Sequence, residues 1–201
     1  MMQYLLATSN KGKIIEMREC LAGLPIIFLT PGDLPHPVSP PHEDMETFEG
    51  NALQKARYYF EKTGIPSIAD DSGILVGALM KELGIHTRRW GAGPKATDEE
   101  WITYFLDRMK KEPDKRARFV CVIALVDAGG EKRTFEGRCD GIITESLEAE
   151  YVPGLPISAC FQPGGVSKVF SALTVKEKNR VSHRGKAMHE LRRHLESMCQ
   201  Q

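Results

Sequence analysis

The stretch IPSIADDSGILV, residues 65–76, sets two adjacent carboxylates between apolar runs. The apolar residues on both sides indicate that this segment is built into the hydrophobic core. Burying an unpaired charge costs several kcal/mol or more, so Asp70 and Asp71 need partners or a ligand. We predict a strand over SIA, a turn at DDSG and a second apolar run over ILVGAL.

This arrangement places DDSG at the end of a strand, where an open α/β sheet binds its ligands. Two carboxylates there can hold Mg²⁺ or position a water, because a hard cation relieves their mutual repulsion. The alternative for the motif alone is a turn in which an aspartate caps backbone N–H groups. Glu43 and Glu46 lie before a helix predicted to begin near Thr47, so they are either metal ligands or partners of the helix dipole.

The rest of the chain alternates between strand and helix patterns, which predicts a mixed α/β fold with a mixed twisted sheet flanked by helices. The long loop LTPGDLPHPVSPPHED holds five of the twelve prolines, and HTRRWGAGPKA is a second predicted loop. Strands are predicted over QYLLA, RARFVCVIALVD and EKRTFEGRCDG, the last two joined by a hairpin at Gly129 and Gly130.

Five helices follow from the spacing of apolar residues and from capping boxes, in which a threonine and a glutamate three residues later cap one helix start. The evidence is a face of Ile14, Ile15, Arg18, Leu21 and Leu24, a stripe from Phe48 to Phe60, capping boxes in residues 97–100 and 174–178, and a seam of Leu191, Leu195 and Met198.

Composition excludes several classes of protein. Lys plus Arg and Asp plus Glu are 27 each, so the chain has no global basic field for coating nucleic acid or anionic membrane. The longest apolar run, FVCVIALV, is too short to span a bilayer, and MMQYLLATSN lacks the basic start of a signal peptide. The five cysteines form no C-x-x-C pair, which favours reduced, packed thiols. We therefore expect a cytoplasmic protein with no nucleic-acid or membrane partner.

The segment LLATSNKGK reads as a strand, a small polar turn and the start of a helix. Backbone N–H groups of such a turn, the helix N-terminus and Lys13 suit a run of phosphate oxygens. The Walker pattern G-x-x-x-x-G-K-[ST] is absent from the turn. An ordinary connection between strand and helix is the alternative.

A third cluster, KEKNRVSHRGKA, gathers basic residues near the C-terminus. Arginine and histidine offer fixed donors to a phosphate or to the carbonyl edge of a base, although a bare charge run also suits a solvated turn between helices. Together, a phosphate turn, a carboxylate pair and a basic clamp fit one ligand, a nucleotide polyphosphate with its metal ion.

The motifs LLATSNKGK, ETFEGNALQKAR, IADDSGI and SHRGKA, in this order and at these separations, resemble the inosine triphosphate pyrophosphatase family. The resemblance runs over residues 3–195. It implies a purine nucleoside triphosphate substrate (ITP, dITP or XTP), cleaved to monophosphate and pyrophosphate with Mg²⁺. It also implies a homodimer and an inosine triphosphatase-like fold, in which one domain, residues 1–201, forms two lobes around a central nucleotide cleft. The related Maf family shares this fold but opens with a serine-proline-arginine motif, which is absent here.

The resemblance also implies a role for each matching residue. Glu43 and Asp71 would bind Mg²⁺, and Asp71 would also be the catalytic base that orients water, with Asp70 supporting it. Ser72 would touch the nucleotide. Lys178, His183 and Arg184 would grip the nucleotide, the last two by reading the purine 6-oxo group. The triphosphate would be wrapped by Thr8, Ser9, Asn10, Lys11, Gly12 and Lys13.

Two segments depart from the family pattern. The usual GFGYDP motif, whose aromatic ring stacks on the base and whose aspartate reads its edge, is replaced by residues 150–163. No aspartate corresponds, the stacking phenylalanine falls at Gly154, and Tyr151 or Phe161 is the substitute ring we consider. Gly50 replaces the usual glutamate before Asn51. The alternative function is therefore a nucleotide-binding member with altered base specificity or lost catalysis, although the aspartate pair favours an active enzyme.

Overall fold

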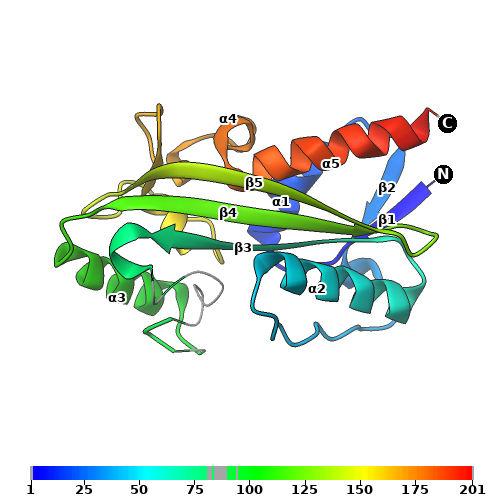
Figure 1. Cartoon of the computed structure of the whole chain (residues 1–201), viewed down its shortest axis with the longest axis horizontal. Coiled ribbons are helices and arrows are strands. Elements are labelled where there is room, and N and C mark those ends of the chain that lie inside the picture. Colours follow the sequence, from blue (N-terminus) through cyan, green and yellow to red (C-terminus); the bar gives the residue numbers. More distant parts are fainter. Residues whose placement is uncertain (1, 81–82, 84–89, 94, 201) are drawn as a thin grey trace.

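The computed structural model describes residues 2–80, 83, 90–93 and 95–200 (Figure 1). Its centre is a six-stranded sheet in the order β2-β1-β3-β4-β5-β6. The pairs β1–β2 and β1–β3 are parallel, and the remaining pairs are antiparallel, so the sheet is mixed. The strands are β1 Met2–Leu6, β2 Ile26–Leu29, β3 Ser67–Val76, β4 Arg116–Val126, β5 Lys132–Ile143 and β6 Phe161–Pro163.

Helices cover both faces of this sheet, with α2 and α3 below it and α4 and α5 above it in Figure 1, and α1 packs against α4 and α5. The predicted mixed α/β fold is confirmed. The α-helices are α1 Lys11–Leu21, α2 Phe48–Thr63, α3 Asp98–Lys110, α4 Val175–Val181 and α5 His183–Cys199. None of the described helices is both long enough and apolar enough to cross a membrane.

Local sequence signals explain where several elements begin and end. Thr97 and Thr174 each open a helix with a complete capping box, as predicted. Helix α2 ends at Gly64, whose φ of 68° is a left-handed conformation that glycine adopts without strain. The hairpin between β4 and β5 turns at Gly130, where φ is 80°. Of the second predicted loop, residues 86–96, the structure describes 90–93, 95 and 96, and the remaining positions lie outside the described residues.

The predicted turn at DDSG is wrong. Residues 67–76 form one continuous ten-residue strand, β3, and every residue of it pairs with β4. The error arose because charged residues were taken to end the strand, whereas polar side chains from α1, α2 and α5 pair with them inside it. Within the described residues, β1 pairs with β3 only at Ser67 and Ile68, so β3 runs on beyond the end of β1.

Because successive side chains of a strand point to opposite faces, the two aspartates do not face each other. Ile68, Asp70 and Ser72 point toward α1 and α5, where Ile68 packs in an apolar cluster with Met17 and Leu191. Ala69 and Asp71 point toward α2, and Ala69 packs there with Ala52, Ala56 and Tyr59. The alternation of β3 therefore assigns each carboxylate to a separate helical layer.

The predicted apolar face of α1 is also wrong in part. Ile15 is 52% exposed, whereas the buried residues of α1 are Gly12, Glu16, Met17, Cys20 and Leu21. The pattern misled because one buried position is a carboxylate, Glu16, which sequence periodicity assigns to solvent.

Candidate active site

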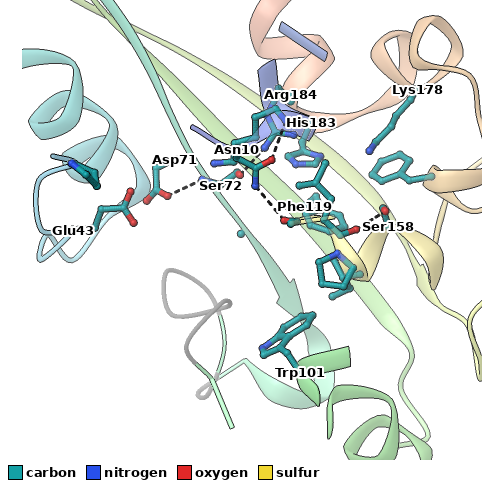
Figure 2. Close-up of a pocket in the computed structure, with 18 of the residues that line it drawn as sticks. Asn10, Glu43, Asp71, Ser72, Trp101, Phe119, Ser158, Lys178, His183 and Arg184 are labelled. Carbon is teal, nitrogen blue, oxygen red and sulfur yellow. Dashed lines mark hydrogen bonds between the residues drawn. The ribbon is translucent and has the colours of Figure 1, made fainter. Parts of the chain in front are cut away.

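A cavity of about 510 Å³ lies beside the part of β3 that extends past β1, and elements from the whole chain line it (Figure 2). Glu43 and Asp71 lie at one side of it, and Lys178 and Ser158 at the opposite side. The lining consists of Asn10, Lys13, residues 40–43, residues 71–73, Trp101, Phe119, residues 154–158, Phe170, Lys178, His183 and Arg184.

Asp70 is held in a buried network of ion pairs. Its Oδ2 atom lies 3.0 Å from Lys13 Nζ and 3.1 Å from Arg184 Nη2. Arg184 also lies 2.5 Å from Glu16 Oε2, and Lys178 Nζ lies 2.5 Å from Glu16 Oε1. Burial alone would raise the pKa of Asp70, but the cations of Lys13 and Arg184 hold it below its ordinary value. Asp70 is therefore a permanently ionised anchor for two cavity-lining cations.

Asp71 sits in a different environment one residue further on. Its Oδ2 accepts a hydrogen bond from Asn51 Nδ2 at 3.0 Å, and its Oδ1 accepts one from the Ser72 amide at 3.0 Å. Burial raises the pKa of Asp71 above its ordinary value, despite the opposing effect of Lys55. Two carboxylates whose pKa values are pushed apart are the usual sign of divided roles, with the raised one suited to proton transfer.

The carboxylates of Glu43 and Asp71 point toward one another at one side of the cavity in Figure 2. Glu43 forms an ion pair with Lys55, which also donates to the backbone oxygen of Asp70 at 3.0 Å. This lysine can reach that oxygen because β1 has already ended there.

The carboxylates of Glu43 and Asp71 fit Mg²⁺ as a pair of ligands rather than as a complete site. Among the described residues, no group of three or more His, Cys, Asp or Glu side chains could hold a metal ion. Mg²⁺ is commonly bound by one or two carboxylates together with substrate phosphates rather than by an all-protein cage. The Glu43 and Asp71 pair therefore suits an ion that shares its remaining ligands with a bound polyphosphate.

The predicted phosphate turn contributes two residues to the cavity lining, Asn10 and Lys13. Asn10 caps α1, because its Oδ1 accepts from the Lys13 amide at 3.2 Å. Ser9 and Lys11 are exposed, and Thr8 accepts a bond from the Asn10 amide at 3.2 Å. Gly12 is buried, and a Cβ there would lie 2.7 Å from Leu155 Cδ1, so its small size lets the turn approach the wall of residues 154–158.

The basic cluster supplies three cavity residues, Lys178, His183 and Arg184. His183 is buried, and its ring stacks on Phe119 at a centroid distance of 4.5 Å. Burial, helped by the nearby Arg184, lowers the pKa of His183 well below its ordinary value, so the ring is neutral near pH 7. Its Nδ1 has no hydrogen-bond partner among the described residues. His183 therefore meets a ligand as a neutral ring, whereas Arg184 carries the charge.

The wall formed by residues 154–158 contains a 3₁₀ helix, Pro156–Ala159. Trp101, Phe119 and Phe170 are the aromatic rings in the described cavity lining. Phe161 is not among them; it is buried behind Phe119 with the ring centroids 4.8 Å apart. Tyr151 also lies outside this lining and packs against the apolar cluster that contains Phe119 and Phe161. The structure thus places neither of the substitute rings that we considered in the cavity wall.

Sequence reasoning missed Glu16, Asn51, Lys55, Trp101 and Ser158. Asn51 and Lys55 were inside ETFEGNALQKAR, and their helical spacing of four residues was the available signal, since it places both on one face of α2. Trp101 reads as an ordinary core residue of α3, and it is 1% exposed.

Gly50, which replaces the usual glutamate of the family pattern, lies in the first turn of α2. Its backbone amide donates to Thr47 Oγ1 at 3.0 Å, and a Cβ at this position would lie 2.9 Å from Met45.

The cavity has carboxylates at one side, fixed cations beside them and aromatic rings further in. This arrangement is typical of an α/β enzyme that acts on a ligand with a polyphosphate group. The chain belongs to the Ham1 family, whose model matches residues 4–194. This confirms the resemblance inferred from the motifs.

Relatives and solved structures agree with this assignment. A dITP/XTP pyrophosphatase of Leptospira interrogans is 40% identical over 195 residues, 97% of this chain and 98% of that protein. A dITP/XTP pyrophosphatase of Thermus thermophilus is 40% identical over 192 residues, which are 94% of this chain and 90% of that protein. The structure of a HAM1 protein from Coxiella burnetii matches with a TM-score of 0.84 at 32% identity, covering 98% of this chain and 100% of that one.

Proposed function

We propose that this chain hydrolyses the nonstandard purine nucleoside triphosphates ITP, dITP and XTP to monophosphate and pyrophosphate in a Mg²⁺-dependent reaction. Family membership and the names of its relatives make the chain a nucleoside triphosphate pyrophosphatase. The observation that carries the finer proposal is the divided environment of Asp70 and Asp71 beside one cavity: Asp70 pairs with Lys13 and Arg184, whereas Asp71 accepts from Asn51 and lines the cavity together with Glu43.

Each charged residue has a task in this reaction. Glu43 and Asp71 would hold Mg²⁺, and the bound ion would supply neutralisation of phosphate charge and a lower pKa of its water. Asp71 would orient the attacking water and take up its proton. Lys13 and the N-terminus of α1 attract phosphate oxygens. Arg184, fixed by Asp70 and Glu16, keeps its charge in place without reorganisation.

Pyrophosphate release from ITP, XTP, GTP and ATP, with Mg²⁺ and with a chelator, tests this proposal. We expect pyrophosphate as the first product, no turnover in the chelator, and some preference for the 6-oxo purines over ATP. Discrimination should be weaker than a buried carboxylate would give, because the wall of residues 154–158 carries no acidic side chain. Orthophosphate as the primary product, in an assay free of other phosphatases, would contradict the cleavage site.

The alternative, a nucleotide-binding member without catalysis, predicts tight binding of these nucleotides and no release of pyrophosphate. The pairing of Asn51 with Asp71 favours the enzyme, since a pure binder needs no carboxylate held in one orientation. The homodimer implied by the family resemblance and the cytoplasmic location expected from the composition remain proposals. A monomer mass by light scattering at micromolar concentration would remove the first.

A further inference from the structure

Ser158 occupies a distinctive place in the cavity. It lies on the 3₁₀ helix Pro156–Ala159, lines the cavity and is 3% exposed. Figure 2 shows it on the side of the cavity opposite Glu43 and Asp71. Its neighbours in the described lining, Pro156 and Ile157, are apolar. A ligand whose phosphates lie at Glu43 and Asp71 therefore extends its other end toward Ser158.

The hydroxyl proton of Ser158 has a fixed direction. Ser158 Oγ lies 2.5 Å from the backbone oxygen of Leu155, and a carbonyl oxygen cannot donate, so the serine is the donor. The Ser158 amide donates to the same carbonyl at 3.1 Å, which holds the residue in place. With its proton used in this way, the hydroxyl oxygen presents only lone pairs to the cavity. In this conformation Ser158 can accept a hydrogen bond from a ligand but cannot donate one.

We propose that Ser158 determines base specificity by accepting a hydrogen bond from N1–H of a 6-oxo purine. This inference rests on the proposed function. Hypoxanthine, xanthine and guanine carry a hydrogen on N1, whereas adenine presents a lone pair there. An adenine N1 would face the Ser158 oxygen with no proton between them, and both acceptors would lose their water partners. A neutral serine thus supplies the acceptor that the departure in residues 150–163 removes, at lower strength than a carboxylate.

The first test compares kcat/KM for ITP and ATP in Ser158→Ala and the wild type. Alanine keeps the hydrogen bond from the backbone amide of residue 158 to the backbone oxygen of Leu155, so the 3₁₀ helix retains this contact. We expect the ITP to ATP ratio to fall roughly fivefold, the worth of one neutral hydrogen bond, through a loss on ITP. An equal loss on both substrates would show that Ser158 only supports the wall and would overturn the proposal.

Ser197→Ala is the matched control. Ser197 Oγ donates to the backbone oxygen of His194 at 2.7 Å, the same three-residue contact, on an exposed part of α5 outside the cavity lining. Its ITP to ATP ratio should equal that of the wild type. Ser158→Asp tests the opposite direction, since a carboxylate accepts more strongly and should raise the ratio at least threefold. A lower ratio in this variant would contradict an acceptor role.

Binding of IMP and AMP by titration calorimetry separates this inference from the proposed function, because neither monophosphate needs to be hydrolysed. We expect IMP to bind more tightly than AMP, and this preference to fall roughly fivefold in Ser158→Ala, the worth of one neutral hydrogen bond. If no triphosphate is cleaved but this pattern holds, the proposed function fails and the role of Ser158 stands. If ITP is cleaved but Ser158→Ala changes neither the kcat/KM ratio of ITP to ATP nor the affinity ratio of IMP to AMP, the role of Ser158 fails and the proposed function stands.

Discussion

The two sides of the cavity are built in different ways. The phosphate side, comprising Lys13, Glu43 and Asp71, uses charged residues of α1 and β3 and of the proline-rich loop before α2, and Arg184 of α5 supplies a further cation to the cavity lining. Arg184 is 1% exposed and is held by Asp70 and Glu16. The base side, comprising Trp101, Phe119, Phe170 and residues 154–158, uses aromatic rings and a short 3₁₀ helix.

This difference shows how each side gains its selectivity. Charges locked by buried ion pairs cannot adapt, so the phosphate side suits one chemistry, whatever base the nucleotide carries. The base side depends on shape, stacking and single neutral hydrogen bonds, each worth about 1 kcal/mol. Substitutions on the phosphate side should therefore have large effects that are the same for every substrate, and those on the base side small effects that differ between substrates.

The largest expected effect follows from Arg184→Met. Removing this guanidinium takes away one of the cations paired with each of the buried carboxylates Asp70 and Glu16, and breaking a buried ion pair typically costs about 3–5 kcal/mol. The free energy of unfolding, from urea titration, should fall by this amount or the protein should fail to fold. Arg193→Met on the same helix is the control, since Arg193 is exposed and pairs with Glu190 at the surface. Equal stability of the two variants would refute the anchoring role of Arg184.

Asp71→Asn should reduce kcat at least roughly a hundredfold for every triphosphate, since an amide neither takes up a proton nor binds Mg²⁺ well. The fold should survive, because burial disfavours the charge of Asp71 and raises its pKa. Pyrophosphate release and a thermal melt check both parts. Asp107→Asn, at an exposed pair with Lys110, should change neither. Near-normal turnover of Asp71→Asn would remove Asp71 from catalysis.

The charged part of the cavity lining could be anticipated from the sequence because its residues occur in short contiguous motifs. TSNKGK, IADDSGI and SHRGKA each hold their functional residues within a few positions, so proximity in space follows from proximity in the chain. Their detailed contacts did not follow. The opposite orientation of Asp70 and Asp71 depends on β3 continuing through DDSG, and that continuation depends on partners from α1, α2 and α5.

The base side could not be predicted, because its members come from separate parts of the chain. Trp101, Phe119 and Phe170 are brought together by three different elements, and each reads in isolation as a core residue. Ser158 gave no signal either, because its value as an acceptor depends on a bond to Leu155 that only the folded 3₁₀ helix creates. Buried Glu16 was missed for the same reason, since its cations lie more than 160 positions away in the chain.

An intermediate effect is expected from Glu16→Gln, and it should depend on pH. Burial acts to raise the pKa of Glu16, but Arg184 and Lys178 together lower it below the ordinary value of 4.5. The contribution of the ionised Glu16 carboxylate to the free energy of unfolding is therefore complete above about pH 5 and is lost as the pH falls below 4.5. The variant should lose about 1.5–3 kcal/mol of unfolding free energy at pH 7, the worth of a hydrogen bond to a charged group.

Urea titrations from pH 7 to pH 3 check this sign. The difference between the wild type and Glu16→Gln should shrink as the pH falls below 4.5, when the wild-type carboxylate becomes protonated. Glu61→Gln, at a surface pair with Arg57, should differ little from the wild type over the whole range. A difference between wild type and Glu16→Gln that stays constant with pH would mean that Glu16 acts through packing rather than charge.

The smallest expected effect concerns the contact between the two sides. Asn10 caps α1 and also donates from Nδ2 to the backbone oxygen of Gly154 at 3.3 Å, which ties the phosphate turn to the base wall. Asn10→Ala should lose about 1 kcal/mol of stability through the cap. It should also raise KM roughly fivefold for ITP and ATP alike, because one hydrogen bond that aligns the two sides is gone. Asn10→Ser separates the two roles, since serine caps a helix but is too short to reach Gly154. It should restore the stability and leave KM raised; recovery of both would show that capping alone explains Asn10.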